Sequence, residues 1–173
     1  YSMRLDVSKA LVAEGREIPF EAEGTLPDTV LLDEVVTFPS PVRLVGHYTS
    51  VGDVIHVRGT MYFTASAQCV RCLKEASHAF ETEFDVLFAL VPDPDNPDLY
   101  IYDGAWIDLA GMAADAALLA FPMQWHCQAD CKGLCPICGA DRNITSCTCR
   151  MEMDDKHPFA ALQQLLTKDE SEV

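Results

Sequence analysis

The strongest constraint on the fold is a two-residue hydrophobic alternation that recurs in three runs between residues 42 and 90. The apolar side of the runs consists of Val42, Leu44, Gly46, Tyr48, Ile55, Val57, Gly59, Met61, Phe63, Ala65, Phe80, Phe84, Val86, Phe88 and Leu90. The opposite side of the third run carries Glu81, Glu83 and Asp85. Successive side chains of a strand point to opposite faces, so this pattern predicts an antiparallel sheet with one buried and one solvated face. A turn signal at Val51-Gly52-Asp53 favours a meander.

Helical patterns flank these strands. Residues 7–13 predict a short helix, and residues 18–26 a further strand. Asp108 is a favourable N-cap for a helix that runs to about Phe121, where Pro122 ends it. We expect this helix to cover the apolar face of the sheet, because its apolar residues recur at spacings of three and four. A short terminal helix starts near Pro158, with the apolar stripe Phe159, Leu162, Leu165 and Leu166. The fold class is therefore α+β.

Composition and charge exclude several classes of protein. Hydrophobic residues make up 49% and charged residues 23% of the 173-residue chain, as in soluble globular proteins. No apolar run is long enough for a membrane span. The net charge of −15 repels nucleic-acid phosphates and anionic lipid, so a basic protein is the easier electrostatic partner. Because no basic leader followed by an apolar stretch is present, we expect a cytoplasmic protein.

Eight cysteines form the second strong feature. One pair lies between two predicted strands, as Cys69-Val70-Arg71-Cys72. The other six occupy a short C-terminal stretch: Cys127, Cys131, Cys135, Cys138, Cys147 and Cys149. Two cysteines separated by two residues can wrap one ion, since the turn aims both sulfurs at a point about 2.3 Å from each. Sites made only of thiolates favour zinc and leave no open catalytic position.

Two other interpretations of the cysteines remain open. Disulfides are permitted by the even count, but a cytosolic chain keeps its thiols reduced. Cys69 and Cys72 could instead carry dithiol redox chemistry, although a redox pair usually opens a helix rather than sitting in a β-hairpin. The metal interpretation is preferred over both.

Eight thiolates divide into two sites of four, which predicts about two zinc ions per chain. The preferred division places Cys135, Cys138, Cys147 and Cys149 on one ion and Cys69, Cys72, Cys127 and Cys131 on the other. An alternative joins Cys69 and Cys72 to Cys135 and Cys138. His126 could replace one ligand. In the preferred arrangement, residues 127–173 form a zinc module with a terminal helix, packed on a β-rich domain of residues 1–126.

The stretch CQADCKGLCPICGADRNITSCTC, residues 127–149, resembles the bacterial YceD family, the large ribosomal RNA subunit accumulation proteins. Cys69-Val70-Arg71-Cys72-Leu73 matches the Cys-x-Arg-Cys signature of that family, and Asp108-Leu109 and residues 159–162 are similar to its pattern. Arg142 departs from the pattern, which commonly has an aliphatic residue there. The resemblance implies a role in large-subunit (23S) ribosomal RNA accumulation and ribosome assembly, and no established reaction.

The residues agree with a non-enzymatic role. No Gly-rich nucleotide-binding loop and no nucleophile elbow is present, so we expect neither catalysis nor a small-molecule substrate. The expected partner is a basic ribosomal protein or a large-subunit rRNA precursor particle. Lys132, Arg142 and Arg150 offer the one local basic patch for RNA phosphate or a partner. The competing hypothesis is a thiol–disulfide oxidoreductase or redox sensor that uses Cys69 and Cys72.

Overall fold

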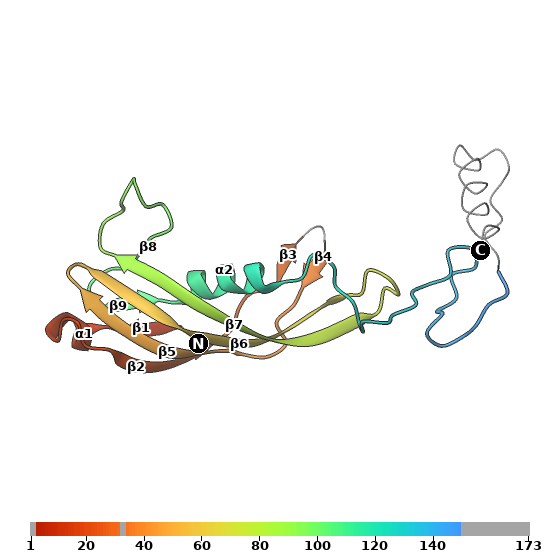
Figure 1. Ribbon diagram of the computed structural model, residues 1–173, viewed down its shortest axis with the longest axis horizontal. Coiled ribbons are helices and arrows are strands. Elements are labelled where there is room, and N and C mark those ends of the chain that lie inside the picture. The colour runs from red at the N-terminus through yellow and green to blue at the C-terminus, as the bar shows by residue number, and fades with distance from the viewer. Residues whose placement is uncertain (1–2, 32–33, 150–173) are drawn as a thin grey trace, which may run out of the picture.

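The computed structural model describes residues 3–31 and 34–149 and is built around a five-stranded sheet (Figure 1). In the order β2-β5-β6-β7-β8, its strands are Ile18–Gly24, Val42–Val51, Val54–Gln68, Glu75–Ala89 and Tyr100–Ile101. The first four are antiparallel neighbours, and β8 pairs with β7 in parallel. The predicted meander and the strand at residues 18–26 are thus confirmed.

The predicted alternation decides which face of the sheet is buried. Every second residue of β5 from Val42 to Ser50 is buried, and the residues between them are exposed or half-buried. In β7, Phe84 and Phe88 are buried while Glu83 and Asp85 are exposed. Leu90 departs from the pattern, because β7 ends at Ala89 and Leu90 is 45% exposed in the following loop.

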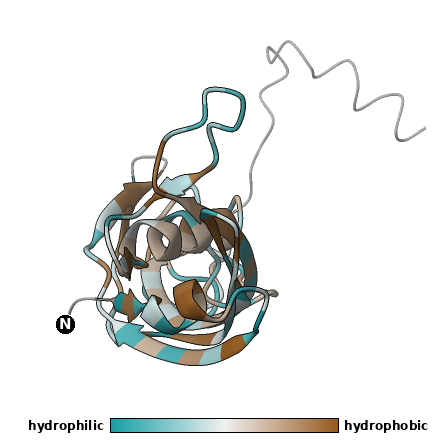
Figure 2. Ribbon diagram, turned by 90° about the vertical axis from the view of Figure 1, so that its left-hand side faces the viewer, coloured by the Kyte–Doolittle hydropathy of each residue, from teal (hydrophilic) through white to brown (hydrophobic). Residues whose placement is uncertain are grey.

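A glycine pair lets the two central strands approach closely. Gly46 of β5 lies opposite Gly59 of β6. A Cβ atom at Gly46 would collide with the carbonyl oxygen of Arg58, and one at Gly59 with that of Val45. The absence of both side chains therefore permits this close backbone approach. In the end-on view of Figure 2 the sheet wraps around α2.

Helix α2, Ala110–Ala120, packs against β7 and buries Met112, Ala113 and Ala117. The predicted covering helix is therefore present, but its start is shifted from the expected N-cap. Leu109 occupies the N-cap position: its carbonyl accepts the first helical hydrogen bond, from the N–H of Ala113 at 2.9 Å, and its own N–H donates to the Met3 carbonyl at 2.8 Å. Asp108 still accepts a hydrogen bond from the N–H of Ala110, at 3.0 Å.

Short elements complete the fold. Helix α1, Ser8–Val12, matches the helix predicted near the N-terminus. Two small antiparallel sheets were not predicted: β1 (Arg4–Asp6) pairs with β9 (Trp106–Asp108), and β3 (Thr29–Leu31) with β4 (Glu34–Val36). Three-residue strands are too short for a two-residue period to be recognised. The predicted helix near Pro158 lies outside the described residues.

The buried side chains form two separate clusters. The larger one joins the inner face of the sheet to α2 and ends in the aromatic rings of Phe63, Phe80, Phe121 and Trp125. The smaller one consists of Cys69, Cys72 and Cys131, with Cys127 and Leu134 packed against them. Neither helix of the described residues has the length and apolar character that crossing a membrane requires.

Candidate metal centre

The loop between β6 and β7 carries the first cysteine pair. Strand β6 ends at Gln68 and β7 begins at Glu75, so Cys69 and Cys72 lie in a β-hairpin loop as expected. The loop is closed by hydrogen bonds from the Cys69 N–H to the Lys74 carbonyl, 2.8 Å, and from the Leu73 N–H to the Cys69 carbonyl, 2.9 Å.

The chain after α2 returns to this hairpin. The indole Nε1 of Trp125 donates to the carbonyl of Ala76 at 3.0 Å. The N–H of Val70 in turn donates to the Trp125 carbonyl at 2.9 Å. These contacts place Cys127 and Cys131 beside the hairpin loop, with Cys69 Sγ 3.9 Å from Cys131 Sγ and Cys72 Sγ 3.6 Å from Cys127 Sγ.

A second turn of the same kind holds Cys135 and Cys138. The N–H of Gly139 donates to the Cys135 carbonyl at 2.9 Å, as the N–H of Leu73 does to Cys69. Gly139 has a φ of 72°, a left-handed conformation that glycine adopts without steric cost. Cys147 and Cys149 complete this group.

The structure therefore contains two groups of four cysteines, and in each the sulfurs lie within 4.8 Å of one another. We call Cys69, Cys72, Cys127 and Cys131 the hairpin group, and Cys135, Cys138, Cys147 and Cys149 the distal group. This is the same grouping as the preferred division from the sequence. Among the described residues, the structure does not bring Cys69 and Cys72 into one group with Cys135 and Cys138, as the crossed alternative requires.

The separations of the sulfurs suit a shared ion. Four sulfurs placed tetrahedrally at about 2.3 Å from a zinc ion would lie about 3.8 Å apart. The measured 3.6 and 3.9 Å in the hairpin group are close to this value. All eight cysteines are free, and a sulfur–sulfur bond would need only about 2.05 Å. Four soft thiolate donors around one centre fit a tetrahedral metal and do not fit a disulfide pair.

Backbone amides prepare one thiol of each group for ionisation. Burial opposes ionisation of Cys69, but the N–H groups of Cys72, Cys127 and Arg71 lower its pKa to about 6. The N–H groups of Cys138 and Ile137 likewise lower the pKa of Cys135 to about 6. The N–H groups two and three residues after the first cysteine act in both turns, as expected for a repeated thiolate-binding motif.

The pKa values of Cys127 and Cys149 are shifted in the opposite direction. Burial, followed by the neighbouring cysteines, raises the pKa of Cys127 to about 12. Contact with the Cys138 side chain is the main cause that raises the pKa of Cys149 to about 12. Crowded thiols cannot all lose their protons unless a cation neutralises them, so a metal ion would change the protonation of both groups.

The two groups differ in burial. In the hairpin group Cys69, Cys72 and Cys131 are 0%, 3% and 3% exposed. In the distal group Cys135 is buried, whereas Cys138 and Cys149 are exposed. Solvent and chelators therefore reach the distal group more readily.

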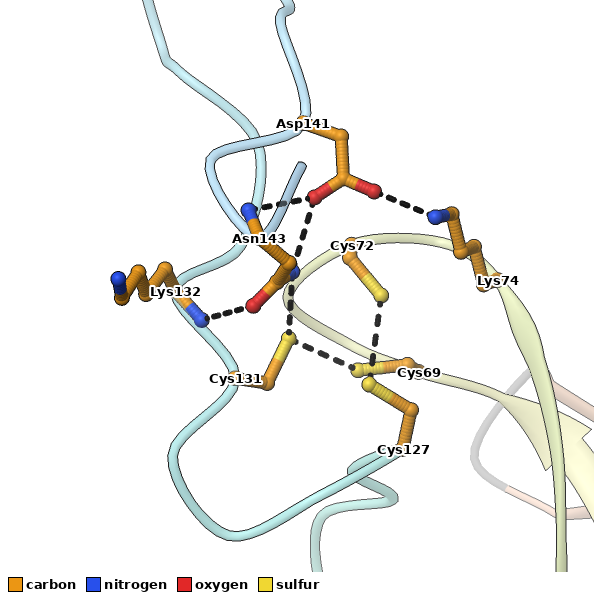
Figure 3. A network of polar contacts seen from close by, with 8 residues as sticks. All are labelled: Cys69, Cys72, Lys74, Cys127, Cys131, Lys132, Asp141 and Asn143. Atoms are coloured by element: carbon orange, nitrogen blue, oxygen red, sulfur yellow. Dashed lines mark hydrogen bonds and ion pairs between the residues drawn. The ribbon is translucent and has the colours of Figure 1, made fainter. Parts of the chain in front are cut away.

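A polar network that sequence analysis missed links the hairpin group to the loop that joins Cys138 and Cys147 of the distal group (Figure 3). Asn143, from the loop between Cys138 and Cys147, donates through Nδ2 to Cys131 Sγ at 3.4 Å. Asp141 of the same loop forms an ion pair with Lys74 of the hairpin, 2.6 Å from Nζ to Oδ2. The spacing Asp-x-Asn could have suggested an Asx turn, since the N–H of Asn143 donates to Asp141 Oδ1 at 2.9 Å.

Other residues singled out from the sequence lie outside these groups. Within residues 3–31 and 34–149, the groups able to hold a metal contain cysteines alone, so His126 is not brought in as a ligand. Its carbonyl oxygen lies 2.6 Å from Nε2 of His78. Lys132 and Arg142 are exposed, and Arg150 lies outside the described residues. Glu81, Glu83 and Asp85 are exposed on β7, and Asp85 lies 2.5 Å from His56 Nε2.

Comparison with known proteins gives one match. A family model described as "Large ribosomal RNA subunit accumulation protein YceD" matches residues 57–166, which include both cysteine groups. No curated protein and no solved structure was found to match the chain.

Proposed function

The chain belongs to the YceD family, and from this premise we propose that it is a non-enzymatic factor that supports accumulation of large-subunit ribosomal RNA. The observation that carries the proposal is the family match across residues 57–166. Its place of action would be the cytoplasm, and its work would be binding rather than chemistry.

The two cysteine groups would each hold one Zn²⁺ ion. Cys69, Cys72, Cys127 and Cys131 would ligate the first ion, and Cys135, Cys138, Cys147 and Cys149 the second. When bound, such ions supply folding free energy, because the site forms only in the folded chain. Four thiolates leave no open coordination position for a substrate. The ion in the hairpin group would fasten residues 127–173, as a small module, onto the β-rich domain of residues 1–126.

A basic ribosomal protein, or an assembly intermediate that exposes one, is the partner we propose. The chain carries 27 acidic against 12 basic residues. Glu81 and Glu83 are exposed on the outer face of β7, at the sheet positions where the sequence placed an acidic face. Opposite charge would speed association and select against other partners, and it would weaken at high salt.

The test has a cellular and a biochemical arm. Cells that lack the gene should accumulate less 23S rRNA, and the wild-type gene should restore it. Protein purified at low salt from cells with the restored gene should carry large-subunit precursor particles or a ribosomal protein, and should release them at high salt. The variant Glu81→Lys/Glu83→Lys should retain fewer of them.

A matched variant controls for total charge. Asp28→Lys/Glu34→Lys makes the same charge change at exposed positions near the β3–β4 hairpin. It should behave like wild type if the β7 face is the binding surface. Normal 23S rRNA in the deleted strain, or purification with no ribosomal component at either salt, would contradict the proposed function.

The redox hypothesis makes opposite predictions. A dithiol enzyme needs an accessible thiolate, but Cys69 is 0% exposed and its sulfur is surrounded by those of Cys72, Cys127 and Cys131. Thiol titration of the purified protein should find unreactive cysteines and about two zinc ions per chain until a chelator is added. Rapid reaction at Cys69 in metal-free protein as isolated would favour the redox hypothesis.

A further inference from the structure

We propose that the two cysteine groups are coupled, so that a metal ion in either group strengthens metal binding in the other. Asn143 is the positioning residue that carries the coupling, because it belongs to the loop of the distal group and contacts a ligand of the hairpin group. This inference rests on the metal binding of the proposed function.

The first step is the contact of Asn143 with Cys131. The amide Nδ2 of Asn143 donates to Cys131 Sγ at 3.4 Å, and its Oδ1 accepts from the N–H of Lys132 at 2.8 Å. The side chain of Asn143 therefore forms hydrogen bonds with both the sulfur of Cys131 and the backbone N–H of the next residue, Lys132 (Figure 3). A donor to a thiolate stabilises its negative charge and fixes its direction, which favours the ionised, correctly oriented ligand that a metal ion requires.

The second step is the support of Asn143 by Asp141. Oδ1 of Asp141 accepts from both the N–H and Nδ2 of Asn143, each at 2.9 Å. Its other oxygen, Oδ2, pairs with Lys74 Nζ at 2.6 Å. The Asp141 side chain is only 15% exposed, and its contact with Lys74 lowers its pKa. The loop is thus tied to the hairpin at Lys74, whose carbonyl accepts from the N–H of Cys69.

The third step is the dependence of this loop on the distal group. Residues 139–146 connect Cys138 to Cys147, so both ends of the loop would be held by the distal ion. Apolar packing contributes little here, because Ile144 is 73% exposed. Backbone hydrogen bonds would remain from the Cys135 N–H to the Ala140 carbonyl, from the Arg142 N–H to the Gly133 carbonyl, and from the N–H groups of Ile144 and Thr145 to the Asp141 carbonyl. Ordering a free chain costs about 1–2 kcal/mol per residue, so the loop would loosen when the distal ion leaves.

These steps give an energetic coupling of defined sign. Loss of the distal ion would withdraw Asn143 from Cys131 and weaken the hairpin group. By linkage, loss of the hairpin ion must weaken the distal group by the same factor. Loss of an outer partner of a metal ligand typically lowers metal affinity about 10–100-fold, so we expect a coupling of about 10-fold.

The experiment measures zinc and cobalt affinity of the full chain by competition with a chelator, and counts bound ions by native mass spectrometry. The variant Cys138→Ser/Cys149→Ser disables the distal group and leaves the hairpin group to be measured alone. Asn143→Ala removes the contact while keeping all eight cysteines. Ile144→Ala is the matched control, since it changes an exposed neighbour in the same loop.

The expected result is a double-mutant cycle without additivity. Each of the two changes, disabling the distal group and Asn143→Ala, should weaken the hairpin group about 10-fold. Their combination should weaken it little further, because both remove the same contact. Ile144→Ala should bind like wild type, and circular dichroism should report an intact sheet throughout.

Two results would overturn the coupling while leaving the proposed function intact. One is wild-type hairpin affinity in Asn143→Ala, and the other is wild-type hairpin affinity when the distal group is disabled. If the wild-type protein binds two ions and both variants keep the wild-type affinity of the hairpin group, the two groups bind metal independently. A wild-type protein that binds no metal overturns both the coupling and the zinc part of the proposed function.

Discussion

Leu73 and Gly139 are equivalent residues of one turn that occurs twice in the chain. Each directly follows the second cysteine of a Cys-x-x-Cys pair, and each has a left-handed φ, 59° for Leu73 and 72° for Gly139. In both turns this residue donates its N–H to the carbonyl of the first cysteine at 2.9 Å. The backbone conformation of the turn, rather than its side chains, therefore directs N–H groups toward the first cysteine. These N–H groups lower the pKa of Cys69 and Cys135.

Because Gly139 has a left-handed backbone conformation, we expect a β-carbon at this position to weaken metal binding by the distal group. A Cβ atom at Gly139 would meet nothing within 4 Å, so Gly139→Ala tests the backbone alone. We expect it to cost about 1 kcal/mol, because left-handed backbone is unfavourable for residues other than glycine. The cost should appear as several-fold weaker metal binding by the distal group in chelator competition.

Helix α2 offers the matched control. Gly111 also has open space around its Cα, but it lies within a helix. Gly111→Ala should therefore raise the free energy of unfolding by about 1 kcal/mol, the opposite sign, because alanine is the better helix former. Unchanged metal affinity of the distal group in Gly139→Ala, or a lower free energy of unfolding in Gly111→Ala, would show that φ is not the deciding variable.

The distal group should be separable from the sheet. Cys138→Ala removes one ligand, so we expect residues 135–149 to lose their order while the meander persists. The basis is that the apolar cluster of the sheet and α2 is distinct from the cysteine cluster. Limited proteolysis with mass mapping should find cleavage confined to the C-terminal segment.

The control for this separation is a substitution in the core of the sheet. Met112→Ala, at a side chain 1% exposed in α2, should cost about 2–5 kcal/mol and destabilise the meander itself. Loss of the sheet in Cys138→Ala as well would contradict the two-part organisation.

Acidification should release the metal ions. In the metal-free chain Cys69 and Cys135 have a pKa of about 6, whereas Cys127 and Cys149 have a pKa of about 12. Between these values the first two thiols are already ionised, and a metal must displace protons from the others. Affinity should therefore fall as pH falls, and more steeply below about 6, where the protons of Cys69 and Cys135 must also leave.

Calorimetry in two buffers of different ionisation enthalpy measures this proton release. Binding at neutral pH should liberate protons, and the number should grow below the pKa of Cys69. Metal binding with no proton release on either side of that pKa would contradict the assigned thiol states.

Long periodic elements and ligand spacing were predictable from the sequence. The alternation from Val42 to Phe88 is strong because one sheet face is buried along β5 and most of β6, and at Phe84 and Phe88 of β7, and register follows from it. The Cys-x-x-Cys turns were predictable because backbone geometry forces two sulfurs toward one point.

Contacts between distant segments were not predictable. The pairing of β1 with β9 joins residues far apart in the chain, through strands of only three residues each. The link from Asn143 to Cys131 depends on how the loop folds back, which no local periodicity records. Leu73 was unexpected in a left-handed conformation, since its neighbours contain no glycine that would signal it.

Trp125 connects the aromatic end of the sheet core to the cysteine segment. Its ring packs against Phe80 and Phe121, its Nε1 donates to the Ala76 carbonyl at 3.0 Å, and it is 7% exposed. Trp125→Phe keeps an aromatic ring but leaves the carbonyl of the half-buried Ala76 without this donor. We expect a loss of about 1–3 kcal/mol in the free energy of unfolding, measured by urea denaturation.

The matched control is Trp106→Phe at the other tryptophan of the chain, which is 53% exposed and should cost less than about 0.5 kcal/mol. The single tryptophan left in Trp106→Phe should then report unfolding of this junction by fluorescence, and an equal cost at both positions would contradict the role of Trp125 as the connecting residue.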